Sequence, residues 1–569
     1  MREGRFAAAL AAAQSAVRRD KDSLAAVGLA AFAALQVGQL DTAERLLRRQ
    51  LELAPGDQAA RGNLATLLAS TNREQEALDI ARHHDGTHRL ARLSGFLHQQ
   101  SGELGRAEAD YVAAVAAESR DFESWNNLGN VRAALGNNSG AATAYETAIN
   151  LGLSTPEVFR ALCNVLRAFE HRSNRLAAAS EGHRRFPGDR DLHIEFALAT
   201  ASSGEPEAAL KELFLLLETE DVFGAAHVEY GLLLENLNRL DDLDAFVARC
   251  EEQSKTGGEF SFIKAWGLRR RNRFDEAWVE ARHIAHTINP IRAEQLRADI
   301  AAGRGDADTA FDAYKAMNEA ALSAFPAPAG PTFREKVEES ISTVGLAARM
   351  PAVESDPALP PDPVFIVGFP RSGTTLLDTL LMALPELQVL EEQPMLSLVR
   401  NAYPSLGLLN QPGPARDAYW KLARQFGAVD GRWLVDKNPL HMAHAAEIYR
   451  LFPSASIVLV ERHPCDVVLS CFMANFVLNH AMRSFTSIEE AALTYDAVFT
   501  AWEAARTALP FRVHAVRYER MIEDLEREMR PLVGFLGLPW RDSVLDNQTS
   551  AALRGHVRTA SYAQVGQPI

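Results

Sequence analysis

Residues 363–392 read PVFIVGFPRSGTTLLDTLLMALPELQVLEE and decide the fold of the chain around them. The apolar run 364–367 is typical of a buried parallel strand. It leads into the loop GFPRSGTT at 368–375, which is followed by leucines at helical spacing. A strand, a glycine-bracketed loop and the first turn of a helix form an anion site, because loop amides and unpaired helix N–H groups converge on one ligand. This stretch therefore predicts an α/β domain with a parallel sheet.

The loop has nearly the spacing of the nucleotide-binding P-loop, G-x-x-x-x-G-K-[ST], but it lacks the lysine. Thr374 stands at that position, and the positive charge lies earlier, at Arg371. A loop without the lysine is poorly suited to hold β- and γ-phosphates with magnesium. PRSGTT after a strand resembles the 5′-phosphosulfate loop of sulfotransferases, which use 3′-phosphoadenosine 5′-phosphosulfate (PAPS) as donor. A Ser/Thr-capped helix after an ordinary turn is the structural alternative.

The resemblance implies that the loop binds the 5′-phosphosulfate group of PAPS. A sulfuryl transfer of this kind requires no metal. The residues that would bind the group are Arg371, Ser372, Gly373, Thr374 and Thr375.

Two further motifs match catalytic positions of the family. In protein-tyrosine sulfotransferases a Glu-Glu pair follows PRSGTT at this spacing, and its second acid, the general base, corresponds to Glu392. A positioned carboxylate can take the proton that an acceptor hydroxyl loses as it attacks sulfur. Lys437 in WLVDKNP matches the lysine of the family's K-x-P segment, which stabilises charge on the departing phosphate oxygen. A solvated acidic turn and a surface lysine are the alternatives.

The β-patterned run 456–460 is followed by ERHPCDVVLS, which resembles the family's 3′-phosphate site. In the family, an arginine after the strand and a serine eight residues later bind this phosphate through a guanidinium and a hydroxyl group. The matching residues here are Arg462 and Ser470. The family often has another arginine four residues beyond the serine, where this chain has Ala474, which implies a weaker clamp. Tyr518 matches a family tyrosine near the adenine, with a core tyrosine as the alternative.

The last residues, 561–569, resemble the start of the loop that closes over the nucleotide. The resemblance assigns Ser561 and Gln564 to the donor site. In relatives this loop continues into a glycine-lysine-tryptophan-like segment, and the sequence stops before it. Two interpretations stay open: the sequence is truncated, or the donor is held without that lid.

The first 320 residues are rich in alanine and leucine, with helical periodicity and a self-similar period of 34 residues. Their pattern resembles the tetratricopeptide repeat (TPR), in which small residues let two antiparallel helices approach and an aromatic ring fills the space between them. The period predicts roughly eight or nine repeats in an all-α solenoid whose concave surface binds a peptide or protein. An irregular helical domain is the alternative. The clearest copy contains Trp125, Leu128, Gly129, Ala141, Tyr145 and Ala148.

The composition changes after the repeats. Eight prolines between Pro326 and Pro363 lie outside any periodic pattern, which is typical of a linker. The sequence therefore predicts a TPR array over 1–320, a Pro/Ala-rich linker with a short helix over 321–361, and a sulfotransferase domain over 362–569.

The net charge of −15 argues against nucleic acid as the main partner, because phosphate backbones demand a basic face. The four cysteines form no CxxC pair, which favours a reduced, cytoplasmic compartment. Residues 1–20 make a poor signal peptide because Gln14 and Ser15 interrupt the apolar run. No apolar run reaches the length of a membrane-spanning helix, so no membrane association is expected.

Taken together, the motifs predict in-line sulfuryl transfer from PAPS to an acceptor hydroxyl. The Glu-Glu spacing favours a peptide or protein tyrosine, with the TPR array binding the acceptor or a partner; glycans and small molecules stay open as acceptors. Two alternatives are a TPR scaffold with an inactive sulfotransferase-like domain and a P-loop kinase-like phosphotransferase that uses ATP and magnesium. The sequence gives no oligomeric state.

Overall fold

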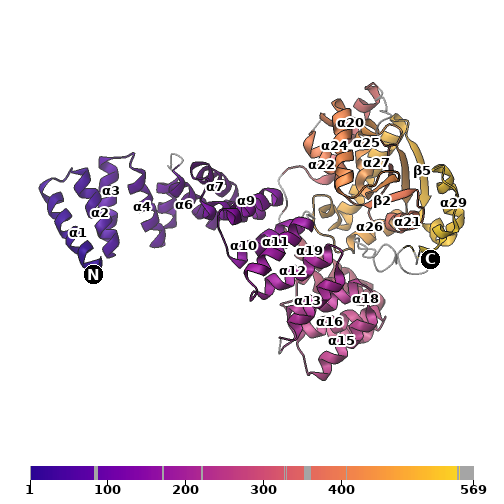
Figure 1. Cartoon of the computed structure of the whole chain (residues 1–569), viewed down its shortest axis with the longest axis horizontal. Coiled ribbons are helices and arrows are strands. Elements are labelled where there is room, and N and C mark those ends of the chain that lie inside the picture. Colours follow the sequence, from indigo (N-terminus) through magenta and orange to yellow (C-terminus); the bar gives the residue numbers. More distant parts are fainter. Residues whose placement is uncertain are drawn as a thin grey trace. The chain divides into compact units, whose positions relative to one another are not determined.

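The structure is a computed structural model, shown in Figure 1, and its contacts divide the chain into two compact units, Met1–Leu216 and Leu217–Ile569. No helix in the described part of the chain is both long and apolar enough to cross a membrane. The structure describes residues 2–82, 87–168, 172–219, 222–325, 327, 330–351, 360–404, 407–547 and 550.

The first unit is a row of helical pairs (Figure 1). Tight turns, several of them with a glycine or asparagine of positive φ, join the two helices of a pair. Its helices are α1 (Arg2–Arg19), α2 (Leu24–Val37), α3 (Leu40–Leu53), α4 (Gln58–Ser70), α5 (Glu74–Ala81), α6 (His88–Gln100), α7 (Leu104–Ala117), α8 (Phe122–Ala134), α9 (Asn138–Asn150), α10 (Pro156–Ala168), α11 (Arg172–Arg185), α12 (Arg190–Ser202) and α13 (Pro206–Leu217).

The packing within these pairs follows the TPR pattern. A Cβ placed on Gly129 of α8 would lie 2.6 Å from the ring of Tyr145 on α9, and one on Gly95 of α6 would lie 3.1 Å from the ring of Tyr111 on α7. Each ring therefore occupies the space that the missing side chain leaves, as the repeat requires. The prediction of a TPR-like helical region is confirmed, and the alternative of an irregular helical domain is wrong.

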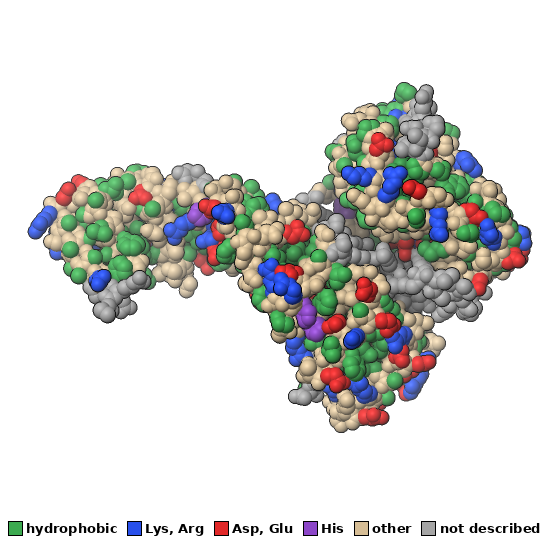
Figure 2. All heavy atoms as spheres, viewed as in Figure 1, with side chains coloured by type: hydrophobic (Ala, Val, Ile, Leu, Met, Phe, Trp, Pro, Cys, Tyr) green, Lys and Arg blue, Asp and Glu red, His purple; other side chains and the backbone are tan. Residues whose placement is uncertain are grey.

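The repeat period also appears in ion pairs between neighbouring pairs of helices. Arg92 Nη1 lies 3.1 Å from Asp121 Oδ1, and Arg160, 68 residues later, lies 3.1 Å from Asp189 Oδ2. On the face shown in Figure 2, Lys and Arg side chains are interspersed with Asp and Glu side chains. Interspersed charges of this kind offset one another locally, so the net charge of −15 does not require an extended acidic face.

The second unit continues the helical pairs and then changes to an α/β domain. The short helix expected within 321–361 is α20 (Phe333–Arg349), which begins with a capping box between Thr332 and Glu335. Phe333 and Val337 of α20 are buried in the core of the α/β domain. The preceding helices are α14 (Ala225–Asn236), α15 (Leu240–Glu252), α16 (Gly258–Arg270), α17 (Phe274–Ala281), α18 (Pro290–Gly303) and α19 (Ala307–Ala324).

The α/β domain is built on five parallel strands in the order β2-β3-β1-β4-β5, which confirms the predicted parallel sheet. The strands are β1 (Val364–Gly368), β2 (Leu387–Glu391), β3 (Trp433–Lys437), β4 (Ser456–Glu461) and β5 (Arg512–Arg517). The helices are α21 (Thr374–Leu381), α22 (Met395–Ala402), α23 (Gly407–Asn410), α24 (Pro412–Gln425), η1 (Pro439–His444), α25 (Ala445–Leu451), α26 (Pro464–Phe472), η2 (Met482–Phe485), α27 (Ile488–Ala508), α28 (Tyr518–Glu523), α29 (Leu525–Phe535) and η3 (Asp542–Leu545).

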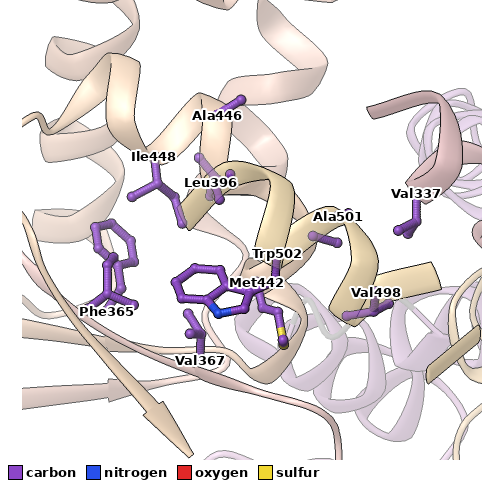
Figure 3. Packing of buried hydrophobic residues seen from close by; sticks show 14 of the residues in the cluster. Val337, Phe365, Val367, Leu396, Met442, Ala446, Ile448, Val498, Ala501 and Trp502 are labelled. Carbon is purple, nitrogen blue, oxygen red and sulfur yellow. The ribbon is translucent and has the colours of Figure 1, made fainter. Parts of the chain in front are cut away.

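Helices cover both faces of the sheet, so its central strand is buried on both sides. Phe365 and Val367 of β1 belong to one core, where Figure 3 shows them near Trp502 of α27. Val364 and Ile366, on the alternate positions, belong to a second core with residues of α21 and α29. This double burial explains why β1 reads as a continuous apolar run. The loop follows β1 at its carboxyl end, the edge at which open parallel sheets bind their ligands.

Candidate active site

Two glycines shape the loop between β1 and α21. A Cβ on Gly368 would lie 2.6 Å from Val460 O and 2.8 Å from Ser372 Oγ. Gly373, the N-cap residue of α21, has φ +103°, and a Cβ there would lie 2.4 Å from Cδ2 of Tyr518. The loop can therefore close against β4 and Tyr518 only with glycine at both positions.

The loop and the end of β2 each hold a residue in a strained backbone conformation. Arg371 has φ +70° and Glu392 has φ +47°. In the described part of the α/β domain these are the only residues other than glycine with positive φ. Such strain costs of order 1–3 kcal/mol per residue and is found mainly at functional sites. The backbone conformation therefore supports a functional role for Arg371 and Glu392, which the sequence also predicts.

Arginine and serine side chains from three elements meet at the loop. Arg371 Nε donates a hydrogen bond to Ser470 Oγ at 3.1 Å, and Arg462 Nη1 donates to Arg371 O at 3.1 Å. The Arg462 guanidinium carbon lies 4.6 Å from the centre of the Tyr518 ring. The residues expected at the 5′-phosphosulfate and at the 3′-phosphate thus lie together, although Ser470 contacts Arg371 here.

The electrostatics of this cluster favour an anion. Burial lowers the pKa of Arg371, and the nearby positive charge of Arg462 lowers it further. Two guanidinium groups held close together repel, and a bound anion between them would offset both the repulsion and the desolvation. The cluster is therefore a local basic site in an acidic protein.

The residues present fit a phosphosulfate nucleotide. Within the described structure, Ser372 Oγ and Arg462 Nε are buried atoms without a hydrogen-bond partner. Buried donors without partners are rare because each costs free energy. Both would be satisfied by an anion rich in acceptor oxygens, such as PAPS. Thr374 and Thr375 lie in the first turn of α21, where helix N–H groups are unpaired.

Lys437 lies at the carboxyl end of β3 and is fully buried. Its Nζ is 2.9 Å from Glu392 Oε1, 3.1 Å from Glu391 Oε1 and 3.5 Å from Asp378 Oδ2. Burial alone would lower the pKa of Lys437, but the three carboxylates outweigh it and raise the pKa. Lys437 is therefore a buried lysine whose positive charge the three carboxylates stabilise, and not a surface lysine.

Two members of this carboxylate group, Asp378 and Glu391, are absent from the sequence prediction. Adjacent residues of a regular strand point to opposite sides, which argues against both acids meeting one group. The left-handed backbone of Glu392 and its N–H bond to Lys437 O at 2.7 Å bring both acids to the same ammonium. The sequence offers one indication for Asp378, which is that it is a single acid among the leucines that follow the loop.

The remaining predicted residues divide into two groups. Tyr518 is half-buried beside the loop and packs against the core that contains α21. Ser561 and Gln564 lie outside the described residues. In the described part of the chain, no group of three or more His, Cys, Asp or Glu side chains is arranged to hold a metal ion.

Substitution of Gly373 by alanine tests the close approach of Tyr518. Gly427 has nearly the same φ, +100°, and nothing within 4 Å of its Cβ position, so Gly427→Ala is a matched control. Both variants carry a backbone cost of roughly 1–2 kcal/mol, but only Gly373→Ala adds overpacking of about 1–3 kcal/mol. Urea unfolding measures the free energy of unfolding of both variants. An equal decrease in the two variants would contradict the close approach of Tyr518 to Gly373.

A scan against protein-family models matches residues 363–542 to the sulfotransferase family. Among curated proteins, protein-tyrosine sulfotransferase 1 of Danio rerio is 27% identical over 230 residues, which cover 36% of this chain and 62% of the relative. Protein-tyrosine sulfotransferase 2 of Gallus gallus is 29% identical over 231 residues, covering 36% and 60%.

The matched part of the chain thus spans about three fifths of these two relatives' length. Among solved structures, YrrB, described as a TPR protein with an unusual peptide-binding site, aligns with a TM-score of 0.28 at 18% identity, covering 32% of this chain and 91% of YrrB. Residues 363–542 are a sulfotransferase family domain similar to the protein-tyrosine sulfotransferases, preceded by a TPR-like helical region.

Proposed function

We propose that the α/β domain transfers a sulfuryl group from PAPS to an acceptor hydroxyl. The observation that carries this proposal is a pair of buried donors beside Arg371, Ser372 Oγ and Arg462 Nε, which have no hydrogen-bond partner among the described residues. A nucleotide with a phosphosulfate at one end and a ribose phosphate at the other supplies acceptor oxygens for all three. When bound, PAPS supplies an activated sulfuryl group on a phosphate leaving group.

The loop residues have the binding role in this proposal. Arg371, Ser372 and the amides at the start of α21 hold the 5′-phosphosulfate, since they converge at one helix N-terminus. Arg462 lies against the same loop and, with Ser470, is assigned to the 3′-phosphate. Tyr518 supports the Arg462 guanidinium through its ring face.

The carboxylates around Lys437 differ in their access to an acceptor. The Glu392 side chain is 43% exposed, whereas Glu391 is 9% exposed and Asp378 is fully buried. Only Glu392 is therefore accessible enough to act as the general base that takes the acceptor proton. Lys437 holds Glu392 in place and places a positive charge where the leaving phosphate oxygen gains negative charge.

The acceptor that this arrangement favours is a tyrosine of a peptide or protein. The support is the similarity to protein-tyrosine sulfotransferases and the presence of a TPR-like region in the same chain. TPR-like solenoids offer extended surfaces for peptides, so the helical region is assigned to binding the acceptor or a partner protein.

Calorimetric titration with 3′-phosphoadenosine 5′-phosphate (PAP), the product nucleotide, tests the donor assignment against its alternatives. PAP is expected to bind at least tenfold tighter than ATP with magnesium, because the loop has Thr374 where a P-loop has its lysine. A preference for ATP would favour the kinase-like alternative. If neither nucleotide binds, the result would favour the alternative of a TPR scaffold with an inactive sulfotransferase-like domain. Transfer of labelled sulfuryl groups from PAPS to proteins of a cell lysate would then identify the acceptor class.

A further inference from the structure

The last helical pair of the TPR-like region, α18 and α19, contacts the helix that carries Ser470. Asn318 of α19 is 6% exposed, and its Nδ2 donates a hydrogen bond to Phe472 O at 2.9 Å. Phe472 is the last residue of α26, where carbonyl groups lack partners within the helix. Asn318 therefore caps the carboxyl end of α26 from a position 154 residues earlier in the chain.

Apolar contacts fix the same end of α26. The Phe472 side chain is buried in a cluster with residues of α18 and α19, and its ring lies 5.4 Å from that of Phe311 and 6.5 Å from that of Tyr314. Just beyond the helix, Asn475 Nδ2 donates to Gln295 Oε1 at 2.9 Å. The end of α26 is thus anchored in the helical pair by a buried ring and by the Asn318 amide, whereas the Asn475 amide holds the segment that follows the helix.

The same turn of α26 contacts the candidate donor site on its other side. Ser470 Oγ accepts the hydrogen bond from Arg371 Nε. The next residue, Cys471, donates from Sγ to Pro370 O at 3.3 Å. One helical turn therefore joins the loop that precedes α21 to a helix of the TPR-like region.

We propose that Asn318 is a positioning residue of the donor site. By holding Phe472 O, it fixes the last turn of α26 and thereby places Ser470 against Arg371. This inference rests on the proposed function, because it concerns how the donor nucleotide is bound. It also extends the catalytic unit, since residues 290–324 of α18 and α19 lie outside the segment 363–542 that matches the sulfotransferase family.

The test compares PAP binding by full-length variants, measured by calorimetric titration. Asn318→Ala is expected to weaken PAP binding about fivefold, the effect of losing one neutral hydrogen bond. Gln295→Ala removes the other amide bond of this interface, but its partner Asn475 lies beyond α26. That control is expected to bind PAP within about twofold of the wild type. Amide hydrogen exchange over 469–473 of the ligand-free chain should become faster in Asn318→Ala alone.

A double-mutant cycle with Ser470→Ala shows whether the effect passes through Ser470. In the Ser470→Ala background, Asn318→Ala is expected to change PAP affinity less than about twofold. Unchanged affinity in Asn318→Ala despite a lower melting temperature would contradict the positioning role, as would fully additive losses. A wild-type chain that binds no PAP would contradict the proposed function itself, whereas normal wild-type binding with an unaffected variant would contradict only the role of Asn318.

Discussion

Replacement of Glu392 by glutamine is expected to lower the rate of sulfuryl transfer by about 10²–10⁴-fold, the usual contribution of a general base. Glutamine keeps the size of the side chain and an oxygen that accepts from Lys437, so the contact at 2.9 Å can persist. It cannot take a proton. PAP affinity should therefore stay within about twofold of the wild type, and the loss should appear in single-turnover transfer from labelled PAPS.

Glu391→Gln is the matched control, because Glu391 is the neighbouring residue and also contacts Lys437 Nζ. Its side chain is only 9% exposed, which keeps it from an acceptor. The rate of sulfuryl transfer is expected to fall less than about tenfold, because Glu391→Gln weakens only one of the contacts that hold Lys437 in place. If Glu391→Gln were the more damaging change, the base would be Glu391. If neither change slowed transfer, the proton would leave by another route.

Local sequence patterns predict the parts of this protein that depend on short-range structure. The loop at 368–375 follows from an apolar strand, two glycines and a helix start, all within one stretch of sequence. Likewise, the TPR-like pairs follow from small and aromatic residues such as Gly129 and Tyr145, which recur with a fixed period and meet within one pair of helices.

The carboxylate group around Lys437 could not be predicted in the same way. Glu391 reaches Lys437 because β2 lies beside β3, and Asp378 reaches it because α21 packs over that part of the sheet. Strand order is a long-range property that no local pattern encodes. The bond between Asn318 and Phe472 has the same origin, and so does the contact of Ser470 with Arg371, which a linear motif had paired with Arg462.

Replacement of Lys437 by methionine is expected to lower the free energy of unfolding by about 3–5 kcal/mol, because it leaves buried carboxylates without their cation. Asp378 is fully buried and Glu391 nearly so, which prevents water from replacing the ammonium. Lys421→Met, at an exposed position on α24, is the control and should cost less than about 0.5 kcal/mol. Urea unfolding measures both. Sulfuryl transfer should also be lost, since the leaving phosphate oxygen loses its positive partner.

The pH dependence of the stability difference between the wild type and Lys437→Met tests whether the charge of Lys437 is its source. The pKa of Lys437 is raised in the folded protein above its ordinary value of 10.5, because the three carboxylates outweigh the effect of burial. The folded state therefore holds this proton longer than the unfolded state, and the stabilising contribution is complete below pH 10.5 and falls as pH rises toward the folded-state pKa. The difference in the free energy of unfolding between the wild type and Lys437→Met should be constant from about pH 7 to 9.5 and should then decrease. A gap that stayed constant to higher pH would show that the loss comes from packing and not from the charge.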